Sequence, residues 1–422
     1  MIPPSRRTRF RSPALAAGLA IAAALPFYPV SSADASGDRL PLGDADLAET
    51  RETQQLADGV ELTRIVRGTE PAPPDQINTT PRGPWVVNVL TIDPAKARGH
   101  VESTYGPDLA PVEKTTDLVR LSGALAGVNA SFFTFNANPQ YPGDPVGLGV
   151  YDGELLSEPT GDRAEADLII DSRSDEVLMG RTAWSGQVRN RQTGATLPLE
   201  HLNHPPVVPA TCAELPDQTQ CDQPGDAVLF NPEFGPTPTG HGVEVVLDQR
   251  GCVVRSSPDA RGTTLDADQT SLQATGHDAA ALLAITERGC LHRTSTLTDE
   301  SGDQVDLHPG LFGVNGRYRL MAGGEVVVPP GSGDFFARNP RTIAGTTPDG
   351  KIVLATLDGR QTTSVGTTMD ETAAVAEALG LTDAVNLDGG GSTTMSVNGA
   401  LTNKPSGSEE RAVGDALIYV ED

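Results

Sequence analysis

Lysine is nearly absent from this 422-residue chain, and arginine supplies almost all of its positive charge. Acidic residues outnumber basic ones, so the formal net charge is −25 at pH 7. A field of that sign repels nucleic acid and anionic membrane surfaces. We therefore expect no nucleic-acid partner, and we expect any anionic substrate to be held by a local cluster of arginines.

Long apolar runs are also missing, apart from residues 14–25 near the N-terminus. This run follows four arginines, is too short to span a bilayer, and precedes the small-residue sequence Ala33-Asp34-Ala35. These features predict a secretion signal peptide over residues 1–35. We therefore expect a secreted, extracellular protein of bacterial type, with no membrane insertion once the signal is removed.

The chain has few cysteines, four in all. In an exported protein four cysteines predict two disulfides, for which three pairings are open. Cys212 and Cys221 bracket a short loop, so we favour that pair and the pair Cys252 with Cys290. Neither pair has the CxxC spacing of a zinc site, and no histidine pair accompanies them.

Several catalytic signatures are absent as well. No serine sits in a Gly-x-Ser-x-Gly elbow, which argues against a serine hydrolase built on that turn. No lysine follows the glycines at 389–391, which excludes a Walker A loop. The third glycine and the following helix of a dinucleotide fingerprint are also missing there.

What the sequence does contain is alternation of apolar and polar residues, which predicts strands. Helical patterns are few, at 118–125, 279–284 and 369–379, and strands are expected at 59–67, 85–93, 127–133, 243–247, 342–346, 352–357 and 384–387. Thr368 and Glu371 form a capping box for the last helix, and Gly380 ends it. We expect an α+β fold with strand-rich mixed sheets, packed helices and a single catalytic domain.

The chain is divided by its composition. Residues 36–58 are polar and predict a tether, and residues 59–422 form the catalytic domain. Residues 185 to about 240 are rich in Pro, Thr, Gln and Asn and predict a loop-rich excursion held by the Cys212–Cys221 disulfide.

The leading candidate for a site is the stretch from Asn386 to Ser392, which reads Asn-Leu-Asp-Gly-Gly-Gly-Ser. It places Asp388 at the end of a predicted strand and follows it with three glycines. Such a loop lets a ligand approach the backbone and turns N–H groups toward an anion. A tight turn with Asp388 as its Asx cap is the structural alternative.

Further acids and arginines lie at predicted strand ends: Asp358, Arg341, Arg360, Glu410 and Arg411. Arginine grips a phosphate in a planar, two-pronged way, so these residues suit hydrolysis of a phosphate-bearing glycoside. A structural ion pair is the alternative for each arginine. The capping box likewise explains Glu371 without catalysis.

These motifs occur in one order along the chain: 127–133, 338–342, 357–360, Glu371, 386–395 and Glu410-Arg411. The series resembles the phosphodiester glycosidase family from about residue 60 to the C-terminus. The resemblance implies a hydrolase that cleaves the glycosidic bond of a sugar-1-phosphodiester, such as one of N-acetylglucosamine, in a cell-envelope or extracellular glycan. The sugar and a phosphomonoester are released.

From this resemblance and the residues themselves we expect Asp388, Asp358 and Glu371 to be the catalytic candidates, in that order. Arg341, Arg360 and Arg411 are expected to bind phosphate, and Asn129 and Asn386 to hold sugar hydroxyls. The rest of the expected substrate-binding set is Gly389, Gly390, Gly391, Ser392 and Glu410.

Two other functions stay open at this point. One is a metal-dependent phosphodiesterase, in which Asp358, Asp388 and Asn386 bind a divalent cation and the P–O bond breaks. The other is a non-catalytic module that binds an envelope glycan. The glycosidase hypothesis requires no cofactor, although a divalent cation is possible.

Overall fold

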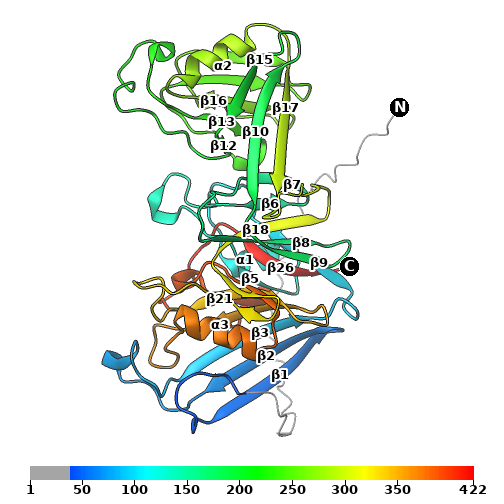
Figure 1. Ribbon diagram of the computed structural model, residues 1–422, viewed down its shortest axis with the longest axis vertical. Helices are drawn as coiled ribbons and strands as arrows, with labels where there is room; N and C mark the ends of the chain where they lie inside the picture. The colour runs from blue at the N-terminus through cyan, green and yellow to red at the C-terminus, as the bar shows by residue number, and fades with distance from the viewer. Residues whose placement is uncertain (1–38) are drawn as a thin grey trace, which may run out of the picture.

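The computed structural model describes residues 39–422, so the expected signal peptide lies outside the described residues. The largest sheet has eight strands and runs along the lower part of Figure 1. Its strands, in spatial order, are β1 (Glu49–Ala57), β2 (Val60–Arg67), β3 (Trp85–Ile92), β22 (Ile352–Leu357), β21 (Arg341–Thr346), β23 (Asp383–Asn386), β19 (Arg319–Ala322) and β20 (Glu325–Val326).

Two five-stranded sheets lie above it in the middle of the molecule (Figure 1). One contains β25 (Ala400–Leu401), β24 (Met395–Val397), β5 (Ala126–Asn129), β26 (Ala416–Glu421) and β4 (Gly99–Thr104). The other contains β7 (Glu154–Ser157), β6 (Gly149–Tyr151), β18 (Leu311–Arg317), β8 (Glu165–Asp171) and β9 (Glu176–Gly180).

Residues 183–298 form a separate lobe at the top of Figure 1, which we call the inserted lobe. A ribbon of β11 (Thr196–Leu199), β10 (Ala183–Asn190) and β17 (Leu291–Thr298) rises into it. The ribbon faces a sheet of β12 (His201–Leu202), β13 (Ala227–Phe230), β16 (Thr270–Ala274), β14 (Val243–Leu247) and β15 (Val253–Ser257).

Three α-helices cover these sheets: α1 (Thr115–Ser122), α2 (Asp278–Thr286) and α3 (Met369–Ala378). The capping box predicted for α3 is present, because Thr368 Oγ1 accepts from the Glu371 N–H and the Glu371 carboxylate accepts from the Thr368 N–H. One-turn 3-10 helices occur at Pro74–Gln76, Phe135–Ala137, Gln218–Gln220, Pro232–Phe234 and Gly390–Ser392.

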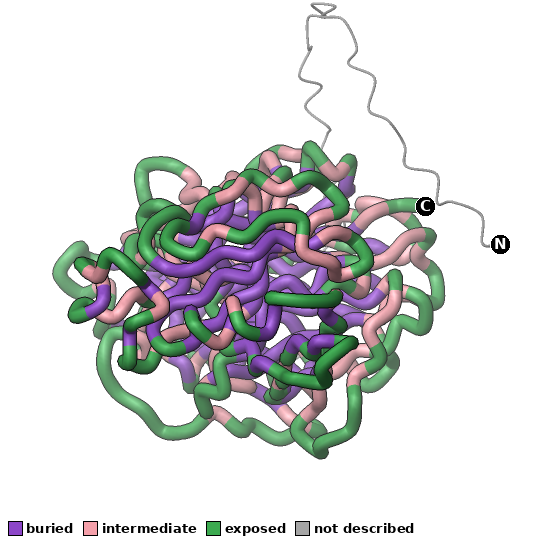
Figure 2. The backbone as a smooth tube through the Cα atoms, turned by 90° about the horizontal axis from the view of Figure 1, so that it is seen from above, coloured by how far each residue is buried: buried purple, intermediate pink, exposed green. Residues whose placement is uncertain are grey.

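The core has layers on both faces of the eight-stranded sheet. One face packs on α3, with Ile343 and Val375 fully buried, and the other packs on the two five-stranded sheets through residues such as Leu354 and Leu417. Seen from above in Figure 2, buried backbone runs through the middle of the molecule and exposed loops surround it. The strand ends that carry the candidate site therefore rest on a well-packed base.

The structure corrects the expected organisation in three respects. Residues 49–57, predicted as tether, form strand β1, and Leu40 and Leu42 are buried in the core. The excursion predicted to end near residue 240 extends to residue 298 and contains the eight strands β10 to β17, while residues 203–226 carry no strand, as a loop-rich segment predicts. The fold is mostly β with a few packed helices, which agrees in part with the expected α+β class. The described sheets are antiparallel except the one that contains β12, which is mixed because β12 pairs parallel with β13.

The disulfide prediction is confirmed. Cys212 pairs with Cys221, and Cys252 pairs with Cys290. Both bonds lie in the inserted lobe, where the first ties a long loop and the second joins the turn before β15 to the start of β17. Within residues 39–422, no helix is long and apolar enough to cross a membrane.

Candidate active site

The candidate residues come together because antiparallel pairing brings the ends of three strands to one edge. Arg341 at the start of β21 pairs with Leu357 at the end of β22, and Ile343 pairs with Asn386 at the end of β23. The loops that carry Asp358 and Asp388 follow directly. The end of β5 joins them, because the Asp388 N–H donates to the Ala130 carbonyl.

Asp388 has the environment expected of a functional carboxylate. Its side chain is 13% exposed, and burial raises its pKa to about 6. Hydrogen bonds from Ser392 and the Gly389 N–H and the charge of Arg411 oppose that rise, and the nearby carboxylate of Asp415 adds to it. Arg411 Nη2 lies 3.4 Å from Asp388 Oδ2. The carboxylate is therefore ionised at pH 7 but only weakly solvated.

The three glycines explain how guanidinium groups reach this loop. A Cβ on Gly391 would lie 3.0 Å from Arg411 Nη1, and a Cβ on Gly390 would lie 3.3 Å from both Nη atoms of Arg360. Gly390 also has φ 62°, a conformation that favours glycine. Two cations thus lie against the bare backbone that follows Asp388.

Arg411 is fixed on two sides. Its Nε donates to Ser392 Oγ at 3.1 Å, and its Nη2 also contacts that hydroxyl. The Phe135 and Phe133 rings lie 4.7 and 5.9 Å from its Cζ. These contacts hold the guanidinium between Asp388 and an aromatic wall.

Arg360 is exposed and pairs with a neutral partner. Its Nε and Nη2 both donate to Asn339 Oδ1, at 3.1 and 2.7 Å. Its own backbone is left-handed, with φ 58°, which is unusual for a residue with a Cβ. A solvent-facing cation without a carboxylate partner is available to an anionic ligand.

Arg341 is placed differently from the expectation. It is buried, its Nη2 donates to the carbonyls of Phe335 and Ala337, and its Nε donates to that of Thr367. Burial, together with the charge of Arg360, lowers its pKa to about 10. Its hydrogen bonds therefore shape the loop beside the site, and no phosphate-binding role follows from them.

The two asparagines also differ. Asn129 is fully buried, with Nδ2 donating to the Asp388 carbonyl at 2.6 Å and Oδ1 accepting from Thr342 Oγ1 and the Thr394 N–H. It positions the backbone of Asp388 and has no free group for a sugar. Asn386 is 1% exposed, and its Oδ1 has no hydrogen-bond partner among the described residues.

Asp358 supports a neighbouring loop. Its carboxylate accepts from Asn403 Nδ2 at 2.9 Å and from the Lys404 N–H at 3.2 Å, and it is 4% exposed. Burial raises its pKa to about 6. Because one oxygen accepts from the Asn403 side-chain amide and the other from the Lys404 N–H, Asp358 is a poorer candidate for the reacting group than Asp388.

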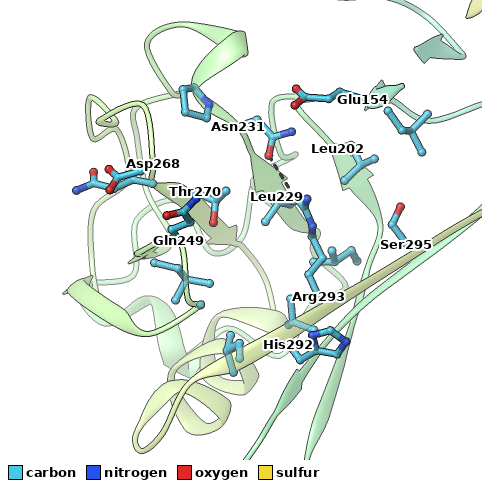
Figure 3. A pocket seen from close by; sticks show the side chains of 18 of the residues that line it. Glu154, Leu202, Leu229, Asn231, Gln249, Asp268, Thr270, His292, Arg293 and Ser295 are labelled. Carbon is cyan, nitrogen blue, oxygen red and sulfur yellow. Dashed lines mark hydrogen bonds between the residues drawn. The ribbon is translucent and has the colours of Figure 1, made fainter. Parts of the chain in front are cut away.

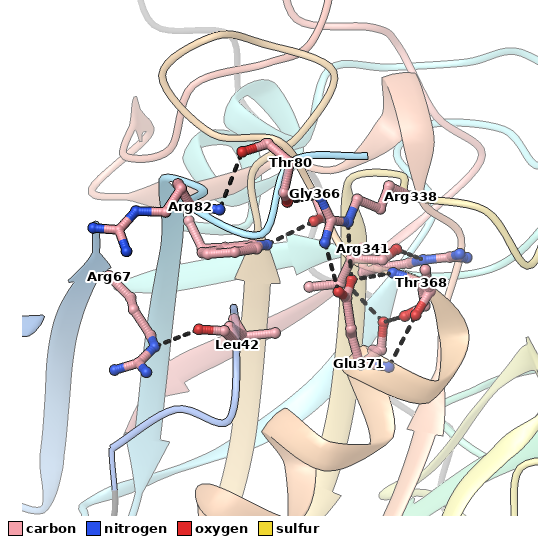
Figure 4. Close-up of polar contacts among 12 residues, drawn as sticks. Leu42, Arg67, Thr80, Arg82, Arg338, Arg341, Gly366, Thr368 and Glu371 are labelled. Carbon is pink, nitrogen blue, oxygen red and sulfur yellow. Dashed lines mark hydrogen bonds and ion pairs between the residues drawn. The ribbon is translucent and has the colours of Figure 1, made fainter. Parts of the chain in front are cut away.

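Glu371 and Glu410 serve as structural acids. Figure 4 shows Glu371 in its capping box and paired with Arg338, whose Nη2 lies 2.8 Å from Oε1. Glu410 accepts from the N–H and hydroxyl of Thr116 and so caps the first turn of α1. Neither carboxylate forms a hydrogen bond or ion pair with Asp388, Arg360 or Arg411 among the described residues.

The sequence reasoning missed Asp415, which lies next to the site. It is fully buried and accepts from the N–H and hydroxyl of Ser131 and from the hydroxyl of Tyr151. The available signal was an acid directly before the apolar run of β26, whereas Asp358 and Asp388 were singled out because they follow strands. Its role is to hold the segment after β5 and to bias the titration of Asp388.

No metal-binding group emerges from the described residues. Within 39–422, His, Cys, Asp and Glu side chains form no cluster of three or more that could hold a metal ion. Both carboxylate oxygens of Asp358 already accept hydrogen bonds, one from the Asn403 side-chain amide and one from the Lys404 N–H.

A partly buried carboxylate, two guanidinium groups and a loop without side chains define an enzyme site suited to hydrolysis beside an anion. Residues 241–420 match the family model of the phosphodiester glycosidases. The family model thus agrees with the resemblance drawn from the sequence motifs.

Solved structures share the fold. A putative exported protein from Burkholderia pseudomallei is 27% identical, with TM-score 0.75, and the match covers 91% of this chain and 98% of that one. A hypothetical protein from Synechocystis is 19% identical, with TM-score 0.67, over 89% of this chain and 64% of that one.

A relative was also found by sequence. The prophage-derived uncharacterized protein YomE of Bacillus subtilis is 38% identical over 84 residues, which is 20% of this chain and 13% of the relative.

Proposed function

We propose that the protein hydrolyses the C1–O glycosidic bond of a sugar-1-phosphodiester and releases the sugar and a phosphomonoester. The observation that carries the proposal is the position of Asp388, whose carboxylate lies 3.4 Å from Arg411 beside a glycine loop that also contacts Arg360. The match of residues 241–420 to the phosphodiester glycosidase family model supports the same reaction.

The arginines would bind the phosphate. Arg360 has only a neutral hydrogen-bond partner, and Arg411 is held rigidly beside the loop. As the C1–O bond breaks, the phosphate gains a negative charge, which these guanidinium groups stabilise. A phosphomonoester has a second pKa near ~6 and leaves readily, so little help from a general acid is needed.

Asp388 would serve the sugar side of the bond. As a base it takes a proton from water while the water oxygen bonds to C1, and as a nucleophile it bonds to C1 and is then displaced by water. In either case the bonding electrons leave with the phosphate oxygen. A pKa of about 6 keeps the carboxylate ionised and reactive near neutral pH.

The substrate class we favour is a phosphodiester-linked glycan of the cell envelope or its surroundings. Two disulfides fit an exported protein, and a structural relative carries the description of an exported protein. Export places the enzyme where such glycans are found.

Hydrolysis of an N-acetylglucosamine-1-phosphodiester in ¹⁸O-water tests the proposal. We expect the label in the released sugar and no label in the phosphomonoester, because water attacks C1. Label in the phosphate would overturn the proposal in favour of P–O cleavage, and addition of EDTA would then test for a metal. Asp388→Asn, which keeps the shape of the side chain, should abolish turnover, and full turnover in that variant would contradict the assignment.

A further inference from the structure

The inserted lobe contains a cleft of about 620 Å³ that takes no part in the Asp388 site. It lies between the β10–β17 ribbon and the sheet that contains β13, and Figure 3 shows it from close by. Its floor is apolar, because Leu202, Leu229 and Leu291 are almost fully buried beneath it. Its rim is polar, and side chains from both walls point into the space.

Arg293 is the central polar group of this cleft. Its Nη1 donates to Asn231 Oδ1 at 3.3 Å, as the dashed line in Figure 3 shows. Glu154 and Glu233 also line the cleft and are close enough to favour the charged form of Arg293, but neither lies within ion-pair distance of it. Arg293 and Glu154 are both exposed, and partial desolvation within the cleft lowers the pKa of Arg293 and raises that of Glu154.

The side chains of Glu154 and Glu233 have no hydrogen-bond donor among the described residues. The cleft thus contains one guanidinium group and two carboxylates that face the same space and form no ion pair with one another. An inorganic anion would be repelled by the two carboxylates, and a simple cation would be repelled by Arg293. A polyhydroxyl ligand satisfies both kinds of group, because each hydroxyl can donate and accept.

An aromatic ring completes the lining. Trp184 borders the cleft, and its indole N–H donates to Ser295 Oγ at 2.8 Å, which fixes the ring. A fixed aromatic ring offers a flat apolar face, and the planar amides and charged groups around it, including Gln249 and Gln269, offer paired donors and acceptors.

We propose that this cleft is a second, non-catalytic binding site for a neutral oligosaccharide, with Arg293, Asn231 and Glu154 bonding to sugar hydroxyls and Trp184 contacting the ring face. The inserted lobe would then hold a glycan chain while the Asp388 site acts elsewhere on it. The inference does not depend on the chemistry at Asp388.

Calorimetric titration tests the site. The protein titrated is the intact chain with the substitution Asp388→Asn, so that no ligand is hydrolysed. The probes are chitotriose, maltotriose and mannotriose, each up to on the order of 10 mM, which detects a Kd in the millimolar range. We expect saturable binding of at least one probe. Tryptophan emission should change with it, since Trp85 is buried elsewhere and Trp184 lines the cleft.

Arg293→Ala should weaken that binding by about tenfold or more, as expected for loss of a charged hydrogen-bond donor. The matched control is Arg255→Ala, which removes an exposed arginine of the same lobe outside the cleft. Absence of binding for all three probes, or equal affinity in Arg293→Ala and its parent, would overturn the proposal. Arg293→Ala should leave the cleavage of a small soluble sugar-1-phosphodiester unchanged. Failure of the second binding site can therefore be distinguished from failure of the proposed hydrolysis.

Discussion

The side-chain amide of Asn129 donates a 2.6 Å hydrogen bond to the main-chain carbonyl of Asp388, and thereby ties the end of β5 to the end of β23. Asn129 Oδ1 also accepts from Thr342 and Thr394, so the residue closes a buried junction between two sheets. It acts on the site through the backbone of Asp388.

We therefore predict that Asn129→Ala lowers the free energy of unfolding by about 2–3 kcal/mol, because buried donors and acceptors lose their partners. Thermal unfolding measures this effect, and kcat measured well below the melting temperature should fall more than KM rises. A variant with unchanged stability would show that the junction is less important than its hydrogen bonds suggest.

The dependence of kcat/KM on pH should reflect the titration of Asp388. Its pKa is raised to about 6, and the reaction needs the ionised form, so kcat/KM should fall as pH drops through about 6. The profile of the native enzyme between pH 4 and 8 checks this, with these limits chosen to span roughly two units on either side of that pKa.

Asp358 also has a pKa raised to about 6, so it is the matched control. Asp358→Asn should keep the acid limb and most of the activity, because its carboxylate bonds to Asn403 and Lys404. If Asp358→Asn removed the fall in activity at low pH, the titrating carboxylate would be Asp358, and the assignment to Asp388 would be wrong.

Replacement of Arg360 should lower activity without lowering the stability of the fold. Arg360→Ala should lower kcat/KM by about 10²–10³-fold, the usual loss for one donor to a developing anion. Stability should change little, since the side chain is exposed and bonds to Asn339 alone among the described residues. Steady-state kinetics and thermal melting are the measurements, with Arg120→Ala, which breaks an exposed ion pair on α1, as the control.

Glu371→Ala should behave in the opposite way. It removes half of the capping box of α3 and the ion pair with Arg338, so we expect a loss of about 1–3 kcal/mol in stability. Activity per folded molecule should be nearly unchanged. Glu371→Gln keeps the cap and should recover part of the stability, and a large fall in kcat in that variant would restore Glu371 as a catalytic candidate.

The stability of the protein should fall at alkaline pH because of His204. Burial alone would lower the pKa of this histidine, but the carboxylates of Asp144 and Glu158 outweigh burial and raise it to about 9. The pKa of the folded state exceeds that of the unfolded state, so the contribution is complete below about pH 6.5 and is lost as pH rises to about 9.

The whole contribution is at most about 3 kcal/mol. Denaturant unfolding from pH 6 to about pH 9.5 should show the decline, and His204→Gln should flatten it over this range. An identical slope in that variant would place the titration on another group, such as His201, which also pairs with Glu158.

Local signals in the sequence predicted local structure well. The capping box and Gly380 bound α3, as the sequence predicts. The β24–β25 hairpin turns at Asn398-Gly399, a pair that favours the positive φ that both residues have. The triple glycine after Asp388 predicted close approach to the backbone, and two guanidinium groups make that approach. In each case the residues that decide the conformation are adjacent in the chain.

Features that depend on distant partners were not predictable in this way. β1 was predicted as tether because most of its side chains face solvent, and only pairing with β2 makes it a strand. Arg341 and Asp358 look like site residues at strand ends. In the structure Arg341 donates to main-chain carbonyls, and Asp358 accepts from the Asn403 side chain and from the Lys404 N–H, 46 positions away. The sequence shows that such groups are available without showing which partners they meet.

The register of the β10–β17 ribbon has a consequence for the history and engineering of the chain. Ala183 and Thr298, the first and last residues of the inserted lobe, are paired across the ribbon. A segment whose ends are neighbours can be gained, exchanged or trimmed at one point without rerouting the strands beneath it. If the cleft in the inserted lobe binds glycan as proposed, exchange of this one module would change the glycan preference and leave the residues around Asp388 untouched.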